Sequence, residues 1–162
     1  MSETRMVSID GSTTCSGMAL FVDGKLKDYG AIDLSSDRSD TDTRLITMCA
    51  KIIQALNIWK PSIVYIEQPQ GYGKNVRVVR LLSEIIGAVK AWGIINGAYV
   101  EEVEPSVWRK ALGIDQGGKK RSDLKQMSIM AVLDVFGINV VEDVADAINI
   151  GAAMLNKYTG EQ

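Results

Sequence analysis

The segment Met6-Val7-Ser8-Ile9-Asp10-Gly11-Ser12 joins an apolar strand to an acidic residue and a turn of small residues. Further strand-like stretches follow at residues 17–22 and 26–34, and the pair Asp23-Gly24 between them is a strong hairpin signal. We therefore expect three strands, at residues 6–10, 17–22 and 26–34, that form an antiparallel meander at the start of the chain.

The pattern then changes to alternating helices and strands. Apolar residues recur with helical spacing from Leu45 to Leu56, and Lys60-Pro61 ends this helix before an apolar strand at residues 63–67. A second helix is expected at about residues 75–95, before a short strand at residues 99–103. Three more helices are expected, at residues 106–112, 123–136 and about 142–158. The sequence thus predicts an α/β fold with a five-stranded mixed sheet, three antiparallel then two parallel strands, flanked by helices.

Length and composition favour one cytoplasmic domain. The chain has 162 residues, of which 46% are hydrophobic, and no linker or low-complexity stretch divides residues 1–162. It contains no apolar run of membrane length and no signal-peptide pattern at its N-terminus. Cys15 and Cys49 are too few for a disulfide framework, so we expect Cys15 in a turn and Cys49 in the core.

Acidic residues mark the ends of the expected strands and the start of the last helix. Asp10 and Glu67 each close an apolar strand, whereas Asp143 and Asp146 are three residues apart and share one helix face. Carboxylate oxygens suit magnesium or manganese, and the absence of histidine excludes Ser-His-Asp and Cys-His nucleophile systems and the usual zinc ligand sets. The four acids therefore indicate phosphoryl chemistry with metal ions. Glu142 adjoins them but lies off their face, and we expect it to be an ordinary acid of the first turn.

Each acid also has a purely structural interpretation. Asp10 could shape its turn, Asp143 and Asp146 could favour a helix N-terminus electrostatically, and Glu67 could lie on an exposed loop. Only the combination of two strand ends and one helix start indicates a common site.

Three motifs and the strand pattern between them resemble the RuvC-type Holliday-junction resolvases of the ribonuclease H-like superfamily. The motifs are Ser8-Ile9-Asp10-Gly11-Ser12, Tyr65-Ile66-Glu67-Gln68-Pro69 and Asp143-Val144-Ala145-Asp146-Ala147. The resemblance covers essentially the whole chain. It implies a ribonuclease H-like fold and a homodimer that cuts branched DNA symmetrically with magnesium, in DNA recombination and repair. The segment at residues 105–110 resembles the phage and Gram-positive branch, whose members are expected to be less selective for four-way junctions.

The resemblance also implies roles for individual residues. Asp10 would bridge two Mg²⁺ ions, Glu67 would hold one, and Asp146 would hold the other with Asp143 beside it; Mn²⁺ would substitute for Mg²⁺. An aromatic residue follows the second acid in such resolvases, and Tyr72 is expected to stack on an unpaired base at the branch point.

The charge distribution bears on DNA binding. The net charge is −2, but residues 69–126 contain ten basic and six acidic residues. We expect DNA contacts from Tyr72, Lys74, Arg109, Lys110, Lys119, Lys120 and Arg121.

The helix at residues 75–95 has more apolar residues than one stripe against a sheet requires, and we expect it to form the homodimer interface. The residues concerned are Val78, Val79, Leu81, Leu82, Ile85, Ile86 and Val89.

Two other functions are compatible with parts of the sequence. Residues 10–17 also resemble the first phosphate loop of the actin and sugar-kinase fold, which would make the chain an ATP-binding module. Such proteins, however, need a second related half and more than twice this length. The other alternative is a relative that binds branched DNA but is catalytically inactive; the presence of all four carboxylates argues against it.

Overall fold

The computed structural model describes residues 3–70, 75–114 and 117–159, so Tyr72 and Lys74 lie outside the described residues. In these ranges the elements are, in chain order, β1 (Arg5–Asp10), β2 (Cys15–Val22), β3 (Lys25–Asp33), α1 (Thr41–Trp59), β4 (Ile63–Glu67), α2 (Val76–Asn96), β5 (Tyr99–Val103), α3 (Pro105–Ala111), α4 (Arg121–Phe136) and α5 (Glu142–Thr159). None of the described helices is long and apolar enough to cross a membrane.

The strands form one mixed sheet with the order β3-β2-β1-β4-β5. β1 pairs antiparallel with β2 and β2 with β3, whereas β1, β4 and β5 run parallel. The expected five-stranded sheet and its strand directions are confirmed. The hairpin at Asp23-Gly24 is also confirmed, because both residues have positive φ angles, 48° and 76°, as a two-residue turn between twisted strands requires.

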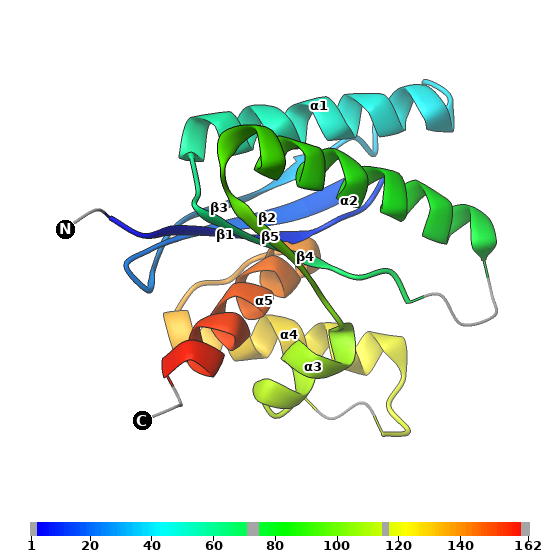
Figure 1. Ribbon diagram of the computed structural model, residues 1–162. Helices are drawn as coiled ribbons and strands as arrows, with labels where there is room; N and C mark the ends of the chain where they lie inside the picture. The colour runs from blue at the N-terminus through cyan, green and yellow to red at the C-terminus, as the bar shows by residue number, and fades with distance from the viewer. Residues whose placement is uncertain (1–2, 71–74, 115–116, 160–162) are drawn as a thin grey trace.

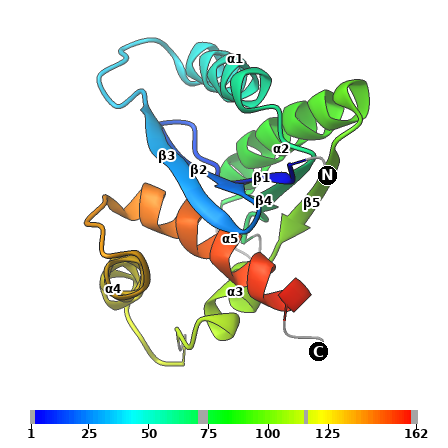
Figure 2. The ribbon, with the colours of Figure 1, turned by 90° about the vertical axis from the view of Figure 1, so that its left-hand side faces the viewer.

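Helices cover both faces of the sheet. α1 and α2 lie side by side on one face, and α5 crosses the other face with α3 and α4 beyond it (Figures 1 and 2). The alternation of strand side chains separates two apolar cores. In β1, Val7 and Ile9 belong to the core under α1 and α2, whereas Met6 belongs to the core under α5.

Small residues allow α5 to lie unusually close to β1 and β2. A Cβ atom at Gly17 would be 1.8 Å from the carbonyl oxygen of Asp143, and one at Gly151 would be 2.3 Å from the ring of Phe21. The Ser8 hydroxyl donates a hydrogen bond of 2.6 Å to the carbonyl oxygen of Ala147. This close contact fixes the start of α5 beside the C-terminal end of β1.

The apolar residues of α2 are largely consumed within the monomer. Leu81, Ile85, Ile86 and Val89 are buried in the core shared with α1 and the sheet. The additional apolar residues that suggested a homodimer therefore mostly contact α1 of the same chain. Exposed apolar residues remain at the two ends of α2, namely Val76 and Val78 at its start and Ile94 and Ile95 at its end.

Candidate active site

The strand register brings Asp10 and Glu67 to the same edge of the sheet. Ile9 of β1 pairs with Ile66 of β4, and both acids follow directly at the C-terminal ends of these parallel strands. Side chains of a strand alternate between the two faces of the sheet, and Ser8 and Tyr65, two positions before these acids, are buried on the α5 side. Both acids therefore face α5 as well. The two carboxylates thus project from neighbouring strands toward the start of α5.

The start of α5 supplies the other two acids. Gly17 pairs with Asp10 across β1 and β2, and the same glycine abuts the backbone of Asp143. Asp10, Glu67, Asp143 and Asp146 all line one cleft of about 690 Å³. The structure therefore brings together the four acids that the sequence predicted as a group.

Burial and neighbouring negative charges raise the pKa values of Asp10, Glu67 and Asp146. The pKa of Asp10 is raised well above its usual value, first by burial and then by the negative charges of Glu67, Asp146, Asp143 and Glu142. Burial is also the largest cause that raises the pKa of Glu67 to about 7 and that of Asp146 to about 6. Opposing hydrogen bonds and the positive charge of Arg109 lower both values. A cleft with this much uncompensated acid favours a bound cation.

Two buried hydrogen-bond donors, neither of them predicted from the sequence, hold carboxylates of the cleft. The indole N–H of Trp108, on α3, donates to Oε2 of Glu67 over 2.6 Å. The hydroxyl of Ser128, on α4, donates to Oδ1 of Asp146. Partners 41 and 18 residues apart in the chain become neighbours only through the tertiary fold.

Glu142 is not an ordinary first-turn acid, contrary to expectation. It lines the cleft, and its charge contributes to the raised pKa values of Asp10 and Asp146. Its carboxylate forms an ion pair with Lys125, which also lines the cleft. The sequence could not reveal this pair, because it depends on how α4 packs against α5.

The two cysteines differ from the expectation in one respect. Cys15 is the first residue of β2 rather than a turn residue. Burial, a hydrogen bond to Asp143 and nearby negative charges raise the pKa of its thiol to about 12. The thiol therefore stays protonated at neutral pH, which argues against a nucleophilic role. Cys49 packs against the core under α1, as expected.

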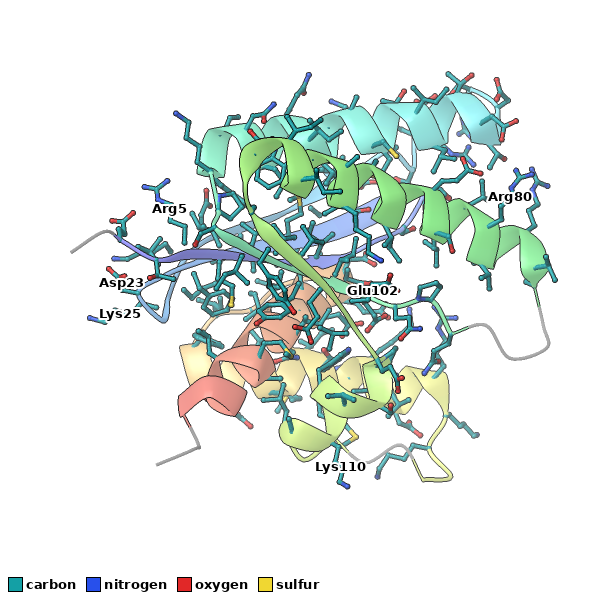
Figure 3. The ribbon with its side chains drawn as sticks, viewed as in Figure 1. Arg5, Asp23, Lys25, Arg80, Glu102 and Lys110 are labelled. Carbon is teal, nitrogen blue, oxygen red and sulfur yellow. The ribbon has the colours of Figure 1, made fainter. Side chains whose placement is uncertain are left out.

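The predicted basic residues divide into two groups. Arg109, Lys119 and Arg121 line the cleft beside the acids, together with Lys125, which the sequence analysis did not single out. Lys110 and Lys120 are not among the residues that line it, and Lys110 extends from α3 away from the sheet (Figure 3). The guanidinium of Arg109 lies over the Trp108 ring, 4.9 Å from its centroid.

The donor set fits hard divalent cations, although the side chains do not form a finished site. Four carboxylates from three elements supply the oxygen ligands that Mg²⁺ and Mn²⁺ prefer. Within the described ranges, no three acidic or cysteine side chains converge closely enough to hold an ion as they stand. Ion binding would therefore draw the free carboxylate oxygens closer together, and the cation would offset the repulsion between them.

Comparison with known proteins identifies the fold. No protein-family model matches the sequence, and no curated protein matches it significantly. The structure of Thermus thermophilus RuvC in complex with a Holliday junction substrate aligns with a TM-score of 0.74 and 18% identity over 97% of both chains. A second structure of Thermus thermophilus RuvC aligns with a TM-score of 0.72 and 20% identity over 97% of both chains.

A more distant resolvase structure agrees with this result. The yeast mitochondrial Holliday junction resolvase Ydc2 aligns with a TM-score of 0.56 and 14% identity, over 94% of this chain and 78% of its own. The strand order, the strand directions and the helices on both faces are thus those of the ribonuclease H-like fold in the form found in RuvC.

Proposed function

We propose that this protein is a metal-dependent endonuclease that cuts Holliday junctions or other branched DNA by phosphodiester hydrolysis. The observation that carries the proposal is the convergence of Asp10, Glu67, Asp143 and Asp146 in one cleft, where burial and the other negative charges raise the pKa of Asp10. A fold shared with RuvC along nearly the whole chain supports branched DNA as the substrate.

The carboxylates would act as ligands for two Mg²⁺ ions. Asp10 has Glu67 on the neighbouring strand β4 and Asp143 beside its pairing partner Gly17, so its carboxylate would be shared between the ions. Glu67 would bind one ion and Asp146 the other, with Asp143 beside it. When bound, the ions would supply activation of a water molecule and stabilisation of the leaving oxygen. Mn²⁺ would replace Mg²⁺ because both accept carboxylate oxygens.

Basic residues in the same cleft would hold the DNA strand near the acids. Arg109, Lys119 and Arg121 line the cleft, so phosphates that enter it meet positive charge beside the site of cleavage. Lys110 and Lys120 would contact phosphates farther from the cut. Tyr72 and Lys74 follow Glu67 in the sequence and are our candidates for contact with the branch point.

Symmetric cutting requires two active sites, and we propose that the protein acts as a homodimer. Exposed Val76 and Val78, at the start of α2, supply apolar surface for the contact. A monomeric mass in light scattering at micromolar concentration would contradict the dimer.

The segment at residues 105–110 supports the phage and Gram-positive branch and hence a broad preference among branched substrates.

A cleavage assay separates this proposal from its alternatives. Labelled four-way, forked and linear duplex DNA would be incubated with the protein in Mg²⁺, Mn²⁺ or EDTA. We expect cleavage of branched DNA in both metals, none in EDTA, and little cleavage of linear duplex. Branched-DNA binding without cleavage in either metal would favour an inactive relative. ATP binding without DNA binding would favour the actin and sugar-kinase alternative.

A further inference from the structure

We propose that Trp108 and Ser128 are positioning residues that orient Glu67 and Asp146 for metal binding. This inference rests on the proposed metal site, and it assigns a functional purpose to two buried hydrogen bonds.

The Trp108 indole fixes one oxygen of Glu67. Trp108 is 0% exposed, and its N–H lies 2.6 Å from Oε2 of Glu67. An indole N–H is a donor only, so this contact always commits a carboxylate oxygen to accept. With Oε2 engaged, Oε1 is the oxygen left for an ion. The position of α3 after β5 thus sets the direction in which Glu67 presents its free oxygen.

A two-step network fixes Asp146 in the same way. The side-chain amide of Asn149 donates to both the carbonyl oxygen and the hydroxyl oxygen of Ser128, over 2.9 and 2.8 Å. Because the Ser128 hydroxyl accepts from Asn149, its own hydrogen is directed elsewhere, and Oδ1 of Asp146 receives it. All three side chains are buried, at 1%, 2% and 8% exposure for Ser128, Asn149 and Asp146. Oδ2 of Asp146 then remains for an ion.

The two donors belong to the helices that precede and follow Lys119 in the chain. Trp108 lies on α3 and Ser128 on α4, and Lys119 lies between them in the chain. The part of the chain that we propose to bind DNA therefore also supplies the groups that orient the metal ligands. Partners of this kind change metal affinity or activity by roughly 10- to 100-fold when they are removed.

Trp108→Phe tests the first donor, since it keeps a buried ring and removes the N–H. Mn²⁺ binding to the protein without DNA would be followed by electron paramagnetic resonance, and the Mg²⁺ concentration for half-maximal cleavage would be measured separately from the rate at saturating Mg²⁺. We expect about 10-fold weaker Mn²⁺ binding and a matching increase in the required Mg²⁺.

Trp92→Phe is the matched control. Trp92 is also buried, at 6% exposure, and its N–H donates to Oδ1 of Asn57 over 2.7 Å, but it lies in the core under α1 and α2. We expect a comparable loss of thermal stability with unchanged Mn²⁺ affinity. A merely structural role for Trp108 would make the two variants indistinguishable in metal binding.

Ser128→Ala tests the second donor against Ser83→Ala. Ser83 is a helical serine on α2 whose hydroxyl donates to the carbonyl oxygen of Val79, and it is not among the residues that line the cleft. We expect Ser128→Ala to weaken Mn²⁺ binding several-fold and Ser83→Ala to leave it unchanged.

The outcomes distinguish this inference from the proposed function. Mn²⁺ affinities of Trp108→Phe and Ser128→Ala within about twofold of wild type would overturn the positioning role while leaving a nuclease intact. A wild-type protein that binds Mn²⁺ without cutting any branched DNA would overturn the nuclease alone. A wild-type protein that binds no Mn²⁺ would overturn both.

Discussion

Two buried tryptophans show how differently the two faces of the sheet are used. Trp92 lies under α1 and α2, and its indole N–H donates to the neutral side chain of Asn57. Trp108 lies on the α5 side and donates to the carboxylate of Glu67. The same side chain thus completes an apolar core on one face and holds a charged group on the other.

The distribution of buried polar side chains extends this contrast. Among the described residues, the buried polar side chains are those of Ser8, Ser16, Ser128, Asp146 and Asn149. None comes from α1 or α2. Burial of polar groups costs stability unless hydrogen bonds compensate, so most of this cost arises on the α5 face. The α1 and α2 face is thus mainly an apolar core, whereas the α5 face also holds the acids that we propose as metal ligands.

Substitutions on the two faces should separate activity from stability most strongly. Asp10→Asn removes a metal ligand's charge and should lower the cleavage rate by at least about 10²-fold without unfolding the protein. Ile52→Ala, in the fully buried core under α1, should instead lower the free energy of unfolding by about 2–5 kcal/mol. Cleavage per folded molecule should then stay near wild type. Comparable activity losses in both variants would break the division between the faces.

The close contact between α5 and β2 offers the next test. Gly17→Ala places a methyl group against the backbone of Asp143, so α5 must shift and carry Asp143 and Asp146 away from Asp10. We expect a loss of about 1–3 kcal/mol in stability and a larger loss in cleavage rate than that alone explains.

Gly30→Ala is the control for this substitution. Gly30 lies on the neighbouring strand β3, and a Cβ atom there would meet nothing within 4 Å. Gly30→Ala should therefore leave cleavage unchanged. Wild-type activity in Gly17→Ala would show that the position of α5 is not critical for the site.

The sequence predicted the acids because each one is marked locally. Asp10 and Glu67 end apolar strands, and Asp143 and Asp146 share the three-residue spacing of a helix face. Glu142 was misjudged because its place in the cleft depends on the contact of α4 with α5 and on its pairing with Lys125. Local spacing does not encode such contacts.

The same limit applies to α2 and to the buried donors. Helical periodicity counts apolar residues but does not say whether a wide stripe meets a sheet, a neighbouring helix or a second subunit. For Leu81, Ile85, Ile86 and Val89 the partners are the sheet and α1. Trp108 and Ser128 carry no local mark of their carboxylate partners either.

The raised pKa values predict how pH affects the metal-free protein. In the folded state Glu67 has a pKa of about 7 instead of its usual 4.5, so the folded protein binds protons more tightly than the unfolded chain. Stability is therefore greatest near pH 5 and falls as the pH rises through about 7, by about 2–4 kcal/mol. Chemical denaturation in EDTA between pH 5 and 8.5 would measure this decrease.

Two comparisons sharpen the pH experiment. Glu67→Gln should flatten the decrease and be more stable than wild type at pH 8, whereas Glu101→Gln on β5 should behave as wild type. Saturating Mg²⁺ should also flatten the wild-type profile, because it stabilises the ionised acids. A wild-type protein in EDTA that gains stability between pH 5 and 8.5 would contradict the electrostatic description of the cleft.

The smallest expected effect concerns two adjacent lysines. Lys119 lines the cleft, whereas Lys120 precedes α4 and its backbone N–H donates to Asp123. Lys119→Ala should reduce the slope of log affinity against log salt by about one unit on branched DNA. Lys120→Ala should change the slope less. The reverse order, measured by fluorescence anisotropy with the fold intact, would move the DNA path away from the cleft.

The most direct test of the metal site is anomalous diffraction from crystals grown with Mn²⁺ and a non-cleavable four-way junction. We expect anomalous peaks in the cleft, bonded to oxygens of Asp10, Glu67 and Asp146. We also expect Oε2 of Glu67 still to accept from Trp108 while Oε1 binds the ion. Mn²⁺ bound elsewhere, or a junction phosphate in the cleft without any ion beside these carboxylates, would contradict the proposed metal site.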